Sequence, residues 1–451
     1  MNLSSIKRLY FVGIGGIGMS ALARFFLNNG IEIFGYDKTK TVLTEKLEAE
    51  GCSIHFDDNV QKIPEGIDLV IYTPAIPPDH QELAYFRRNF YPVKKRAEVL
   101  GIISRSKRCI AMAGTHGKTT TSSMISFVLR FGGIDCSAFL GGIVKDYASN
   151  FVFGKSDWIV AEADEYDWSF LHLSPELAII SSVDADHLDI YKNENLMVPA
   201  FQKFADKVKP DGVLFLANEV FDKIEQSEAI NYFRYGIEEG DYFADKIRVE
   251  EGAFVFDANY PDGKIENIKL QLAGRHNIEN AMAAIAIAKY LNIENEKIKK
   301  AFAEFKGIHR RFDIRFHSGE KVYVDDYAHH PTELKAAIHA AKELYPGKKV
   351  TGIFQPHLYS RTRDFVEGFA EALDGLDHVI FLPIYPAREV AIPGVTSTLI
   401  MEKMSNENKV LKQKEELIEY LTTIDFEVLL TLGAGDIDVF VPQIESVLNH
   451  G

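Results

Sequence analysis

The sequence is poor in cysteine: only Cys52, Cys109 and Cys136 occur among 451 residues. An odd number of cysteines without metal-ligand spacing argues against a disulfide framework and against a zinc motif. No secretory leader precedes the first predicted strand, so we expect a reducing, cytoplasmic location. No apolar stretch reaches the roughly 20 residues of a membrane-spanning helix, and we expect no membrane insertion.

Positive charge is also in short supply, because 50 Lys and Arg face 65 Asp and Glu, a formal net charge of -15. Binding to nucleic acid needs clustered basic residues, so we expect no nucleic-acid partner. Hydrophobic residues at 46% and charged residues at 25% are typical of globular proteins and exclude disordered and fibrous classes. The chain is too long for one core and predicts about three domains.

Residues 109–121 read as a buried strand, a glycine-bracketed loop and the start of a helix. Backbone N–H groups at a helix N-terminus bind polyphosphate, Lys118 is placed to reach the outer phosphates, and the Thr119 hydroxyl is placed to reach Mg²⁺. The first glycine of the general phosphate-loop pattern falls at Met112, so the match is incomplete. A structural glycine turn with a solvated lysine is the alternative.

A second glycine-rich turn, from Gly13 to Gly18, follows the first predicted strand and opens a helix. The next strand ends in Asp37, and a later one, over 69–72, ends at Thr73. Such a strand–turn–helix–strand unit indicates binding of a nucleotide diphosphate, with the acid on ribose hydroxyls. NAD is the default ligand of this pattern, and a purely structural turn is the alternative.

Acidic residues follow two strands downstream of the phosphate loop. Glu162, Asp164 and Glu165 follow the strand over 158–161, and Asp184, Asp186, His187 and Asp189 follow the strand over 177–182. Carboxyl ends of neighbouring parallel strands meet at one edge, so we expect these groups opposite the phosphate loop. Oxygen ligands suit Mg²⁺, with a histidine as the less usual addition. Helix capping or solvation of the acids is the alternative.

The stretch 241–272 alternates apolar and polar residues and predicts a small side sheet. After it, Asn277 and Asn280 lie one turn apart at the start of an alanine-rich helix, where they either read an adenine edge or cap and pack the helix. Arg310 and Arg311 supply two guanidinium groups for a phosphate, or else belong to a charged linker.

The C-terminal third alternates strands and helices again, which predicts another parallel sheet. Asp325 to Glu333 contains two aspartates and two adjacent histidines, but adjacent residues on an extended chain point apart, so we expect no shared metal there. His357, Arg361 and Arg363 follow another strand and suit a carboxylate-bearing substrate; a surface salt-bridge cluster is the alternative.

These motifs together resemble the ATP-dependent Mur ligases of peptidoglycan synthesis over essentially the whole chain. The resemblance is carried by Gly-Thr-His-Gly-Lys-Thr-Thr-Thr, Glu-Ala-Asp-Glu, Asp-His-Leu-Asp, Gly-Arg-His-Asn-Ile-Glu-Asn and Asp-Asp-Tyr-Ala-His-His-Pro-Thr-Glu. It implies an α/β fold of three domains: a Rossmann-like domain over 1–107 for a UDP-sugar, a central P-loop-type ATPase domain over 108–312, and a Rossmann-like domain over 313–451 for an amino acid.

Within this family, the turn Gly-Ile-Gly-Gly-Ile-Gly-Met-Ser and residues 354–364 are similar to the members that join L-alanine to the lactyl carboxylate of UDP-N-acetylmuramate. The implied reaction uses ATP and Mg²⁺ and passes through an acyl phosphate. It would serve cell-wall biogenesis, cell shape and cell division, in a cytoplasmic monomer or homodimer. A ligase that recycles a whole tripeptide onto the same UDP-sugar is the closest alternative; an NAD-dependent oxidoreductase and a regulatory nucleotide-binding module are others.

The resemblance also implies roles for particular residues. The expected UDP-sugar ligands are Gly13, Gly15, Gly16, Gly18, Met19, Ser20, Asp37 and Thr73; the ATP ligands are Gly114, Thr115, His116, Gly117, Lys118, Thr119, Thr120, Asn277, Asn280, Arg311 and Asp326; the metal ligands are Thr119, Glu162 and His187; the amino-acid ligands are Tyr327, His329, His357 and Arg361; and the catalytic residues are Lys118, Glu162, His187, His329 and Arg361.

This chain departs from the family pattern at one position and leaves another open. Leu358 stands where many relatives have arginine, which shifts the expected carboxylate ligands to Arg361 and His357. Some sister ligases use a carbamylated lysine; near its expected place stand residues 201–203, and we predict no carbamate there.

Overall fold

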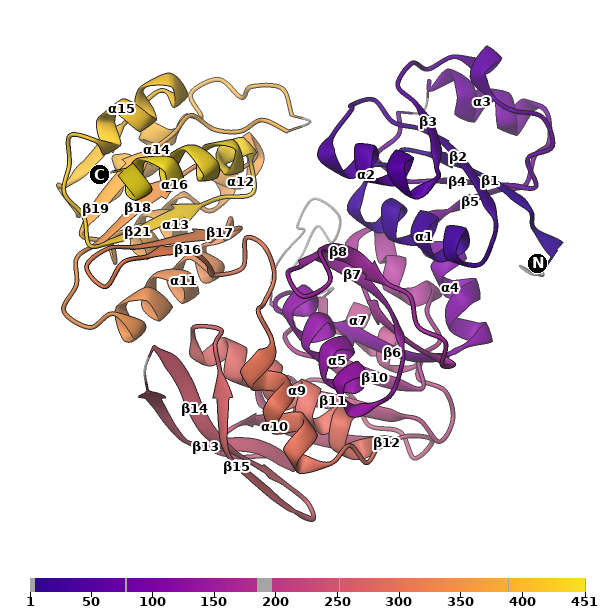
Figure 1. Ribbon diagram of the computed structural model, residues 1–451, viewed down its shortest axis with the longest axis horizontal. Coiled ribbons are helices and arrows are strands. Elements are labelled where there is room, and N and C mark those ends of the chain that lie inside the picture. The colour runs from indigo at the N-terminus through magenta and orange to yellow at the C-terminus, as the bar shows by residue number, and fades with distance from the viewer. Residues whose placement is uncertain (1–4, 78, 185–196, 251, 388, 451) are drawn as a thin grey trace. The chain divides into compact units, whose positions relative to one another are not determined.

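The computed structural model describes residues 5–77, 79–184, 197–250, 252–387 and 389–450. Its chain forms two compact units, one of 1–245, 257–268 and 279–305, the other of 246–256, 269–278 and 306–451. Three β-sheets follow one another along the sequence, each with helices on it (Figure 1). The predicted α/β class is confirmed, while the exact boundaries at 107 and 312 stay predictions.

The first sheet is parallel, with the strand order β3-β2-β1-β4-β5. Its core includes Tyr10, Val70 and Phe86, which are buried. The glycine turn joins β1 to α1, as the sequence predicts. The elements are β1 Arg8–Val12, α1 Ile17–Asn28, β2 Glu32–Tyr36, α2 Val42–Glu50, β3 Ser53–His55, η2 Val60–Lys62, β4 Leu69–Tyr72, α3 Gln81–Arg88, β5 Val93–Lys95 and α4 Arg96–Ser106.

The second sheet has ten strands in the order β15-β14-β13-β12-β11-β10-β6-β9-β7-β8. Strand β6 runs parallel to both its neighbours, β9 and β10, so the carboxyl ends of all three lie at one edge, as predicted. The elements are β6 Arg108–Ala113, α5 Lys118–Gly132, β7 Ser137–Val144, β8 Ser149–Val152, β9 Trp158–Glu162, η3 Tyr166–His172, β10 Leu177–Ile180, α7 Met197–Ala205, β11 Val213–Ala217, α8 Asn218–Phe221, β12 Asn231–Ile237, β13 Tyr242–Glu250, β14 Ala253–Tyr260, β15 Gly263–Leu270, α9 Arg275–Tyr290 and α10 Asn295–Glu304.

The predicted side sheet over 241–272 is wrong in one respect. Strands β13, β14 and β15 do form there, but they continue the second sheet beyond β12, through the pairing of Tyr235 with Tyr242. Alternation of apolar and polar residues identifies a strand and its buried face, whereas the neighbour that a strand pairs with depends on the whole sheet.

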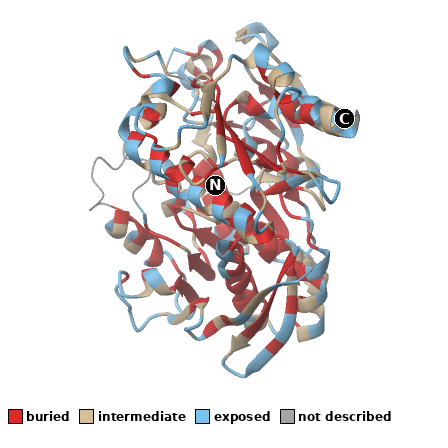
Figure 2. Ribbon diagram, turned by 90° about the vertical axis from the view of Figure 1, so that its left-hand side faces the viewer, coloured by how far each residue is buried: buried red, intermediate tan, exposed pale blue. Residues whose placement is uncertain are grey.

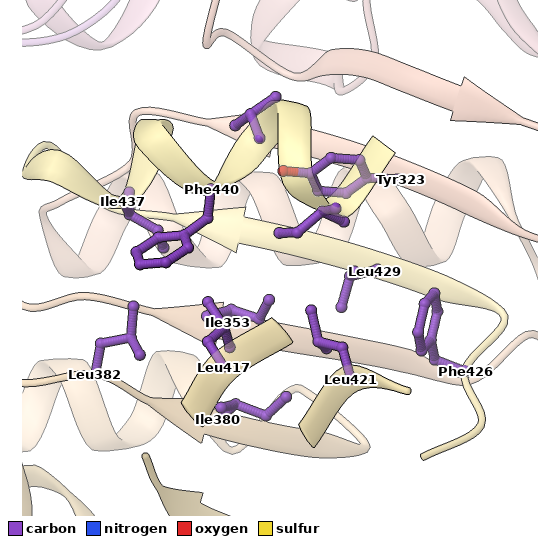
Figure 3. Packing of buried hydrophobic residues seen from close by; sticks show 12 residues of the cluster. Tyr323, Ile353, Ile380, Leu382, Leu417, Leu421, Phe426, Leu429, Ile437 and Phe440 are labelled. Atoms are coloured by element: carbon purple, nitrogen blue, oxygen red, sulfur yellow. The ribbon is translucent and has the colours of Figure 1, made fainter. Parts of the chain in front are cut away.

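The third sheet has the order β16-β17-β21-β18-β19-β20 and is parallel except for β16. Buried side chains from the helices, among them Leu417 and Ile437, face Ile353, Ile380 and Leu429 of the strands (Figure 3). The elements are β16 Asp313–His317, β17 Val322–Asp326, α11 Pro331–Leu344, β18 Val350–Phe354, α12 Tyr359–Asp364, α13 Val366–Leu373, β19 His378–Phe381, α14 Ser397–Met401, β20 Lys409–Leu411, η5 Lys414–Glu416, α15 Leu417–Leu421, β21 Val428–Leu432, η6 Asp436–Phe440 and α16 Val441–His450.

Burial follows the sheets: the central strands are buried, and exposed residues lie on helices, turns and outer strands such as β13 and β15 (Figure 2). All three cysteines are free and buried, and burial raises the pKa of each thiol to about 12. None of the helices within the described ranges has the length and apolar character needed to cross a membrane.

We expect Leu429→Ala to destabilise the third sheet by about 2–5 kcal/mol, because it removes a buried side chain and leaves a cavity. Native-state hydrogen exchange of the β17, β18 and β21 amides measures this loss locally, which suits a chain of several units. Val439→Ala is the matched control, since that side chain is 55% exposed and its loss should change stability by less than about 0.5 kcal/mol. Equal protection in the two variants would contradict the proposed core.

Candidate functional site

The phosphate loop lies between the end of β6 at Ala113 and the start of α5 at Lys118, so the predicted strand–loop–helix order is confirmed. Gly114 and Gly117 both have positive φ, +138° and +79°. A side chain at Gly114 would also collide with Ser181. The loop therefore requires glycine at both positions, and Met112, in place of the general pattern's first glycine, lies in the buried strand.

Ser181 and Ser182, directly after β10, hold this loop in place, although the sequence analysis did not select them. The hydroxyls of Thr115 and Ser182 are 2.8 Å apart, and the His116 N–H donates to the Ser182 hydroxyl at 3.0 Å. The Ser181 hydroxyl donates to the His116 carbonyl at 2.7 Å. The sequence did contain a signal for this contact: two adjacent hydroxyl residues directly follow a predicted strand near the loop.

Lys118 is held in the loop by oxygen atoms. Its ammonium donates to the carbonyls of Gly114 and Thr115, at 2.6 and 3.2 Å, and to the carboxylate of Glu165 at 2.9 Å. Burial by itself would lower the pKa of Lys118, but Glu165 and the other nearby carboxylates raise it. The lysine is therefore charged at neutral pH, next to a buried acid.

Glu162 and Thr119 lie together, as the sequence predicts for a metal site. The Thr119 hydroxyl donates to one oxygen of Glu162 at 3.1 Å. The other oxygen accepts hydrogen bonds from the Ser122 hydroxyl, at 3.1 Å, and from the Gly141 N–H. A side chain at Gly141 would collide with both Glu162 and Thr119, so this glycine, which the sequence analysis missed, allows the approach. Burial raises the pKa of Glu162, and these hydrogen bonds lower it in part.

This donor set fits Mg²⁺. A carboxylate and an adjacent hydroxyl are hard oxygen ligands, and two protein ligands leave positions for phosphate oxygens and water. The third predicted ligand, His187, lies outside the described residues, as do Asp186 and Asp189. Within the described ranges, no group of three or more His, Cys, Asp or Glu side chains forms a ready-made metal cage.

The two asparagines of α9 have different surroundings. Asn280 lies against the phosphate loop: its carbonyl oxygen accepts from the Thr121 hydroxyl at 3.0 Å and faces Gly117. The Asn277 amide donates to the Ala273 carbonyl at 2.6 Å, which is not an N-cap because a capping side chain accepts from a backbone N–H; the residue belongs to the second unit. Thr120 is buried in the first turn of α5. Contact of any of these with ATP stays a prediction.

At the first sheet, the structure brings together the glycine turn, Asp37 and Thr73. The Gly15 N–H donates to the Asp37 carboxylate at 2.7 Å. A side chain at Gly13, whose φ is +88°, would lie 2.8 Å from the Thr73 methyl group. These residues lie close together, and their binding of a UDP-sugar stays a prediction. By contrast, Met19 and Ser20 are buried within the fold.

Arg96 was not predicted at this turn, although it lies in a basic run after β5. Its guanidinium occupies the space next to Gly18, where a Cβ atom would be 2.8 Å from Nη1. It also lies 3.6 Å from Asp164, in the acidic run after β9. The neighbouring Lys95 pairs with Asp167 at 2.7 Å. Ion pairs of Lys95 and Arg96 thus join the start of α4, which lies beside Gly18, to the acidic residues after β9.

In the second unit, His329 lies among the residues that follow β17. Its Nδ1 is 3.0 Å from the Tyr327 carbonyl and 3.2 Å from the Glu333 carboxylate. Burial lowers the pKa of His329 although Glu333 opposes the shift. His357 is beside it, with ring centroids 6.0 Å apart, and stacks on Tyr385. Tyr385 and Glu333 were not among the predicted ligands.

Arg361 lies in the short helix α12. It is close enough to His329 for its positive charge to lower the pKa of that histidine as well. Leu358, just before that helix, has a φ of +69°. The predicted amino-acid ligands Tyr327, His329, His357 and Arg361 therefore gather in one part of the second unit.

Arg311 and Asp326, expected at ATP, lie in the same unit. Arg311 lies over the Tyr327 ring at 5.4 Å and 3.7 Å from Glu333. Asp326 accepts from the Phe312 and Ala328 N–H groups, at 2.6 and 2.7 Å, and burial raises its pKa to about 6. Their contact with ATP stays a prediction.

Comparison with known proteins covers the chain in three parts. Residues 8–108 match the model described as Mur ligase family, catalytic domain; 112–288 match the Mur ligase middle domain; and 310–435 match the Mur ligase, glutamate ligase domain.

Individual relatives match the entire length. A UDP-N-acetylmuramate–L-alanine ligase of Flavobacterium johnsoniae is 47% identical over 454 residues, covering 100% of both chains. The crystal structure of a UDP-N-acetylmuramate–alanine ligase from Thermotoga maritima has a TM-score of 0.83 at 28% identity and covers 98% of this chain and 100% of its own. A murein peptide ligase from Psychrobacter arcticus, with a TM-score of 0.71, 21% identity and 98% coverage of both chains, shares the fold. With the phosphate loop, the glycine turn and the histidine cluster all inside regions of detectable similarity, the chain belongs to the Mur ligase family.

Proposed function

We propose that this protein uses ATP to join L-alanine to the lactyl carboxylate of UDP-N-acetylmuramate, as a cytoplasmic step of peptidoglycan synthesis. The observation that carries the proposal is full-length similarity, at 47% identity, to a relative named for that reaction. The local geometry supports it, because Lys118 lies in the phosphate loop and Thr119 lies against Glu162, an arrangement that suits the phosphate and metal contacts of phosphoryl transfer.

The reaction begins with phosphorylation of the lactyl carboxylate. Lys118 would move from Glu165 to the outer phosphates of ATP and offset the charge that develops during transfer. Thr119 and Glu162 would hold Mg²⁺, which supplies Lewis-acid stabilisation to the phosphate oxygens. The loop N–H groups from Gly114 to Thr119 would fix the polyphosphate at the start of α5.

The second step is attack of the L-alanine amine on the acyl phosphate, with loss of phosphate. The amine must give up a proton, and His329, kept neutral by burial, is suited to accept it. Arg361 and His357 would bind the carboxylate of the amino acid. Water must be excluded meanwhile, because an acyl phosphate hydrolyses.

The recycling ligase remains the second candidate because a murein peptide ligase shares the fold. This chain is 21% identical in sequence to that murein peptide ligase, against 47% to the L-alanine ligase of Flavobacterium johnsoniae. The segment 354–364, with His357 and Arg361 beside His329, further favours a single amino acid.

The choice of acceptor can be measured directly. With ATP, Mg²⁺ and UDP-N-acetylmuramate present, we expect phosphate release to start on addition of L-alanine and to be slower with glycine or L-serine. An acceptor-free reaction is the control for ATP hydrolysis. Phosphate release only with the tripeptide would favour the recycling ligase. Absence of phosphate release with every acceptor tested would favour a regulatory module.

Lys118→Ala should lower turnover by at least about 100-fold, since it removes the charge that faces the transferred phosphate. UDP-N-acetylmuramate binding, followed by calorimetry, should stay nearly unchanged because the glycine turn belongs to another sheet. Lys223→Ala, at an exposed lysine of the same unit, should retain full turnover. Simultaneous loss of turnover and sugar binding in Lys118→Ala would contradict the assignment of two separate sites.

Glu162→Gln tests the metal assignment. The amide keeps the shape of the side chain but loses its charge, so the Mg²⁺ concentration for half-maximal phosphate release should rise at least about 10-fold. Glu176→Gln is the matched control, since that carboxylate pairs with Arg108 at the start of β6. An unchanged Mg²⁺ dependence in Glu162→Gln would remove this residue from the metal site.

A further inference from the structure

Asn150, in the short strand β8, is fully buried. Within the described residues, its side-chain amide forms hydrogen bonds with the helix α1. Its nitrogen donates to the Ile17 carbonyl, at 2.5 Å, and to the Ser20 hydroxyl, at 3.0 Å. Its oxygen accepts a hydrogen bond from the Arg24 guanidinium. All three partners are on α1, at spacings that place them on a single face of the helix.

That face of α1 begins at the glycine turn. Ile17 is the first residue of the helix and follows directly on Gly16. The Ser20 hydroxyl also donates to the Ile17 carbonyl, at 2.9 Å, so this carbonyl of the first helical turn accepts from both Ser20 and Asn150. Farther along the helix, Arg24 is bound to Glu50 of α2 at 2.7 and 2.8 Å.

The β7–β8 hairpin, which carries Asn150, also contacts Glu162 near the phosphate loop. Strand β8 pairs with β7, which pairs in turn with β9, the strand that ends in Glu162. The β7–β8 register shifts between Phe139 and Val144, and within that irregular stretch lies Gly141, the N–H donor to Glu162. A single hairpin therefore contacts both the start of α1 and the candidate metal ligand.

Apolar packing also joins α1 to this hairpin, and the two lie side by side (Figure 1). Phe25 of the helix packs on Phe139 and Phe151, with ring centroids 5.4 and 6.2 Å away. Such packing is non-directional and holds the helix close without fixing its rotation. The three hydrogen bonds of Asn150 are directional, and a buried polar group that lost them would be left unsatisfied.

We propose that Asn150 is a positioning residue, which fixes the sugar-binding turn relative to Glu162 and Lys118 so that the lactyl carboxylate meets the γ-phosphate. This inference rests on the proposed function, because the two ligands must react with each other. The residue bonds to Ser20, one of the expected sugar ligands, but is not itself an expected ligand; it acts through α1 on one side and through the hairpin on the other. Reacting atoms displaced by about 1 Å can slow a reaction about 100-fold.

Two substitutions test the proposal in the full chain. Asn150→Ala removes all three bonds. Asn150→Asp keeps an acceptor for Arg24, now as an ion pair, but offers no donor to Ile17 or Ser20. We expect both variants to lower kcat for L-alanine-dependent phosphate release by about 10- to 100-fold. The KM for ATP and the Kd for UDP-N-acetylmuramate should change by less than about threefold, since each site remains intact.

Ser149→Ala is the matched control, because the neighbouring hydroxyl only accepts from the Phe151 N–H within the strand. It should keep kcat within about twofold. Calorimetric stoichiometry of UDP-N-acetylmuramate gives the fraction of folded sites, and kcat is expressed per folded site. Wild-type kcat per site in both Asn150 variants, or a loss matched by lost binding stoichiometry, would overturn the proposal.

Wild-type turnover with L-alanine, measured alongside, separates this inference from the proposed function. A wild-type chain without turnover would refute the function. An active wild type with equally active Asn150 variants would refute only the positioning role.

Discussion

Two carboxylates buried beside one phosphate loop set the constraint on this site. Glu162 is the last residue of β9 and Glu165 follows it, and both are held where burial disfavours their charge. A buried ion without a partner costs several kcal/mol, so each acid needs positive charge or hydrogen-bond donors. Lys118 donates directly to Glu165, whereas among the described residues Glu162 accepts from hydroxyl and N–H groups and feels the Lys118 charge without a hydrogen bond to it. Glu162 is therefore the acid of the two that matches the proposed metal site.

The order of strands follows from the same constraint. Strands β9 and β10 flank β6. The end of β9 and the residues after it supply the acids Glu162 and Glu165 on one side of the loop, and the end of β10 supplies the serines that hold its backbone on the other. Ser181 and Ser182 hold the loop backbone, so in the proposed reaction Lys118 would exchange Glu165 for phosphate without a change in the loop. Preorganisation of this kind lowers the cost of charge development during phosphoryl transfer.

Much of the site was predictable because its signals are local in sequence. The phosphate loop needs only a strand, glycines, Lys118 and a helix, and Asp37 and Thr73 meet the glycine turn because parallel strands share an edge. Gly141, Arg96 and Asn150 were not predictable. Each matters through contacts with residues distant in sequence, which depend on strand order and on one irregular hairpin. The same dependence hid the continuation of the second sheet into β13.

The buried thiols give the molecule an unplanned experimental advantage. Maleimides react with thiolates that solvent reaches, and here the three native cysteines are both covered and strongly disfavoured as thiolates. The native cysteines should therefore take up little maleimide dye. A pair of cysteines introduced on exposed helices, one in each compact unit, would carry dyes for single-molecule energy transfer without deletion of any natural residue.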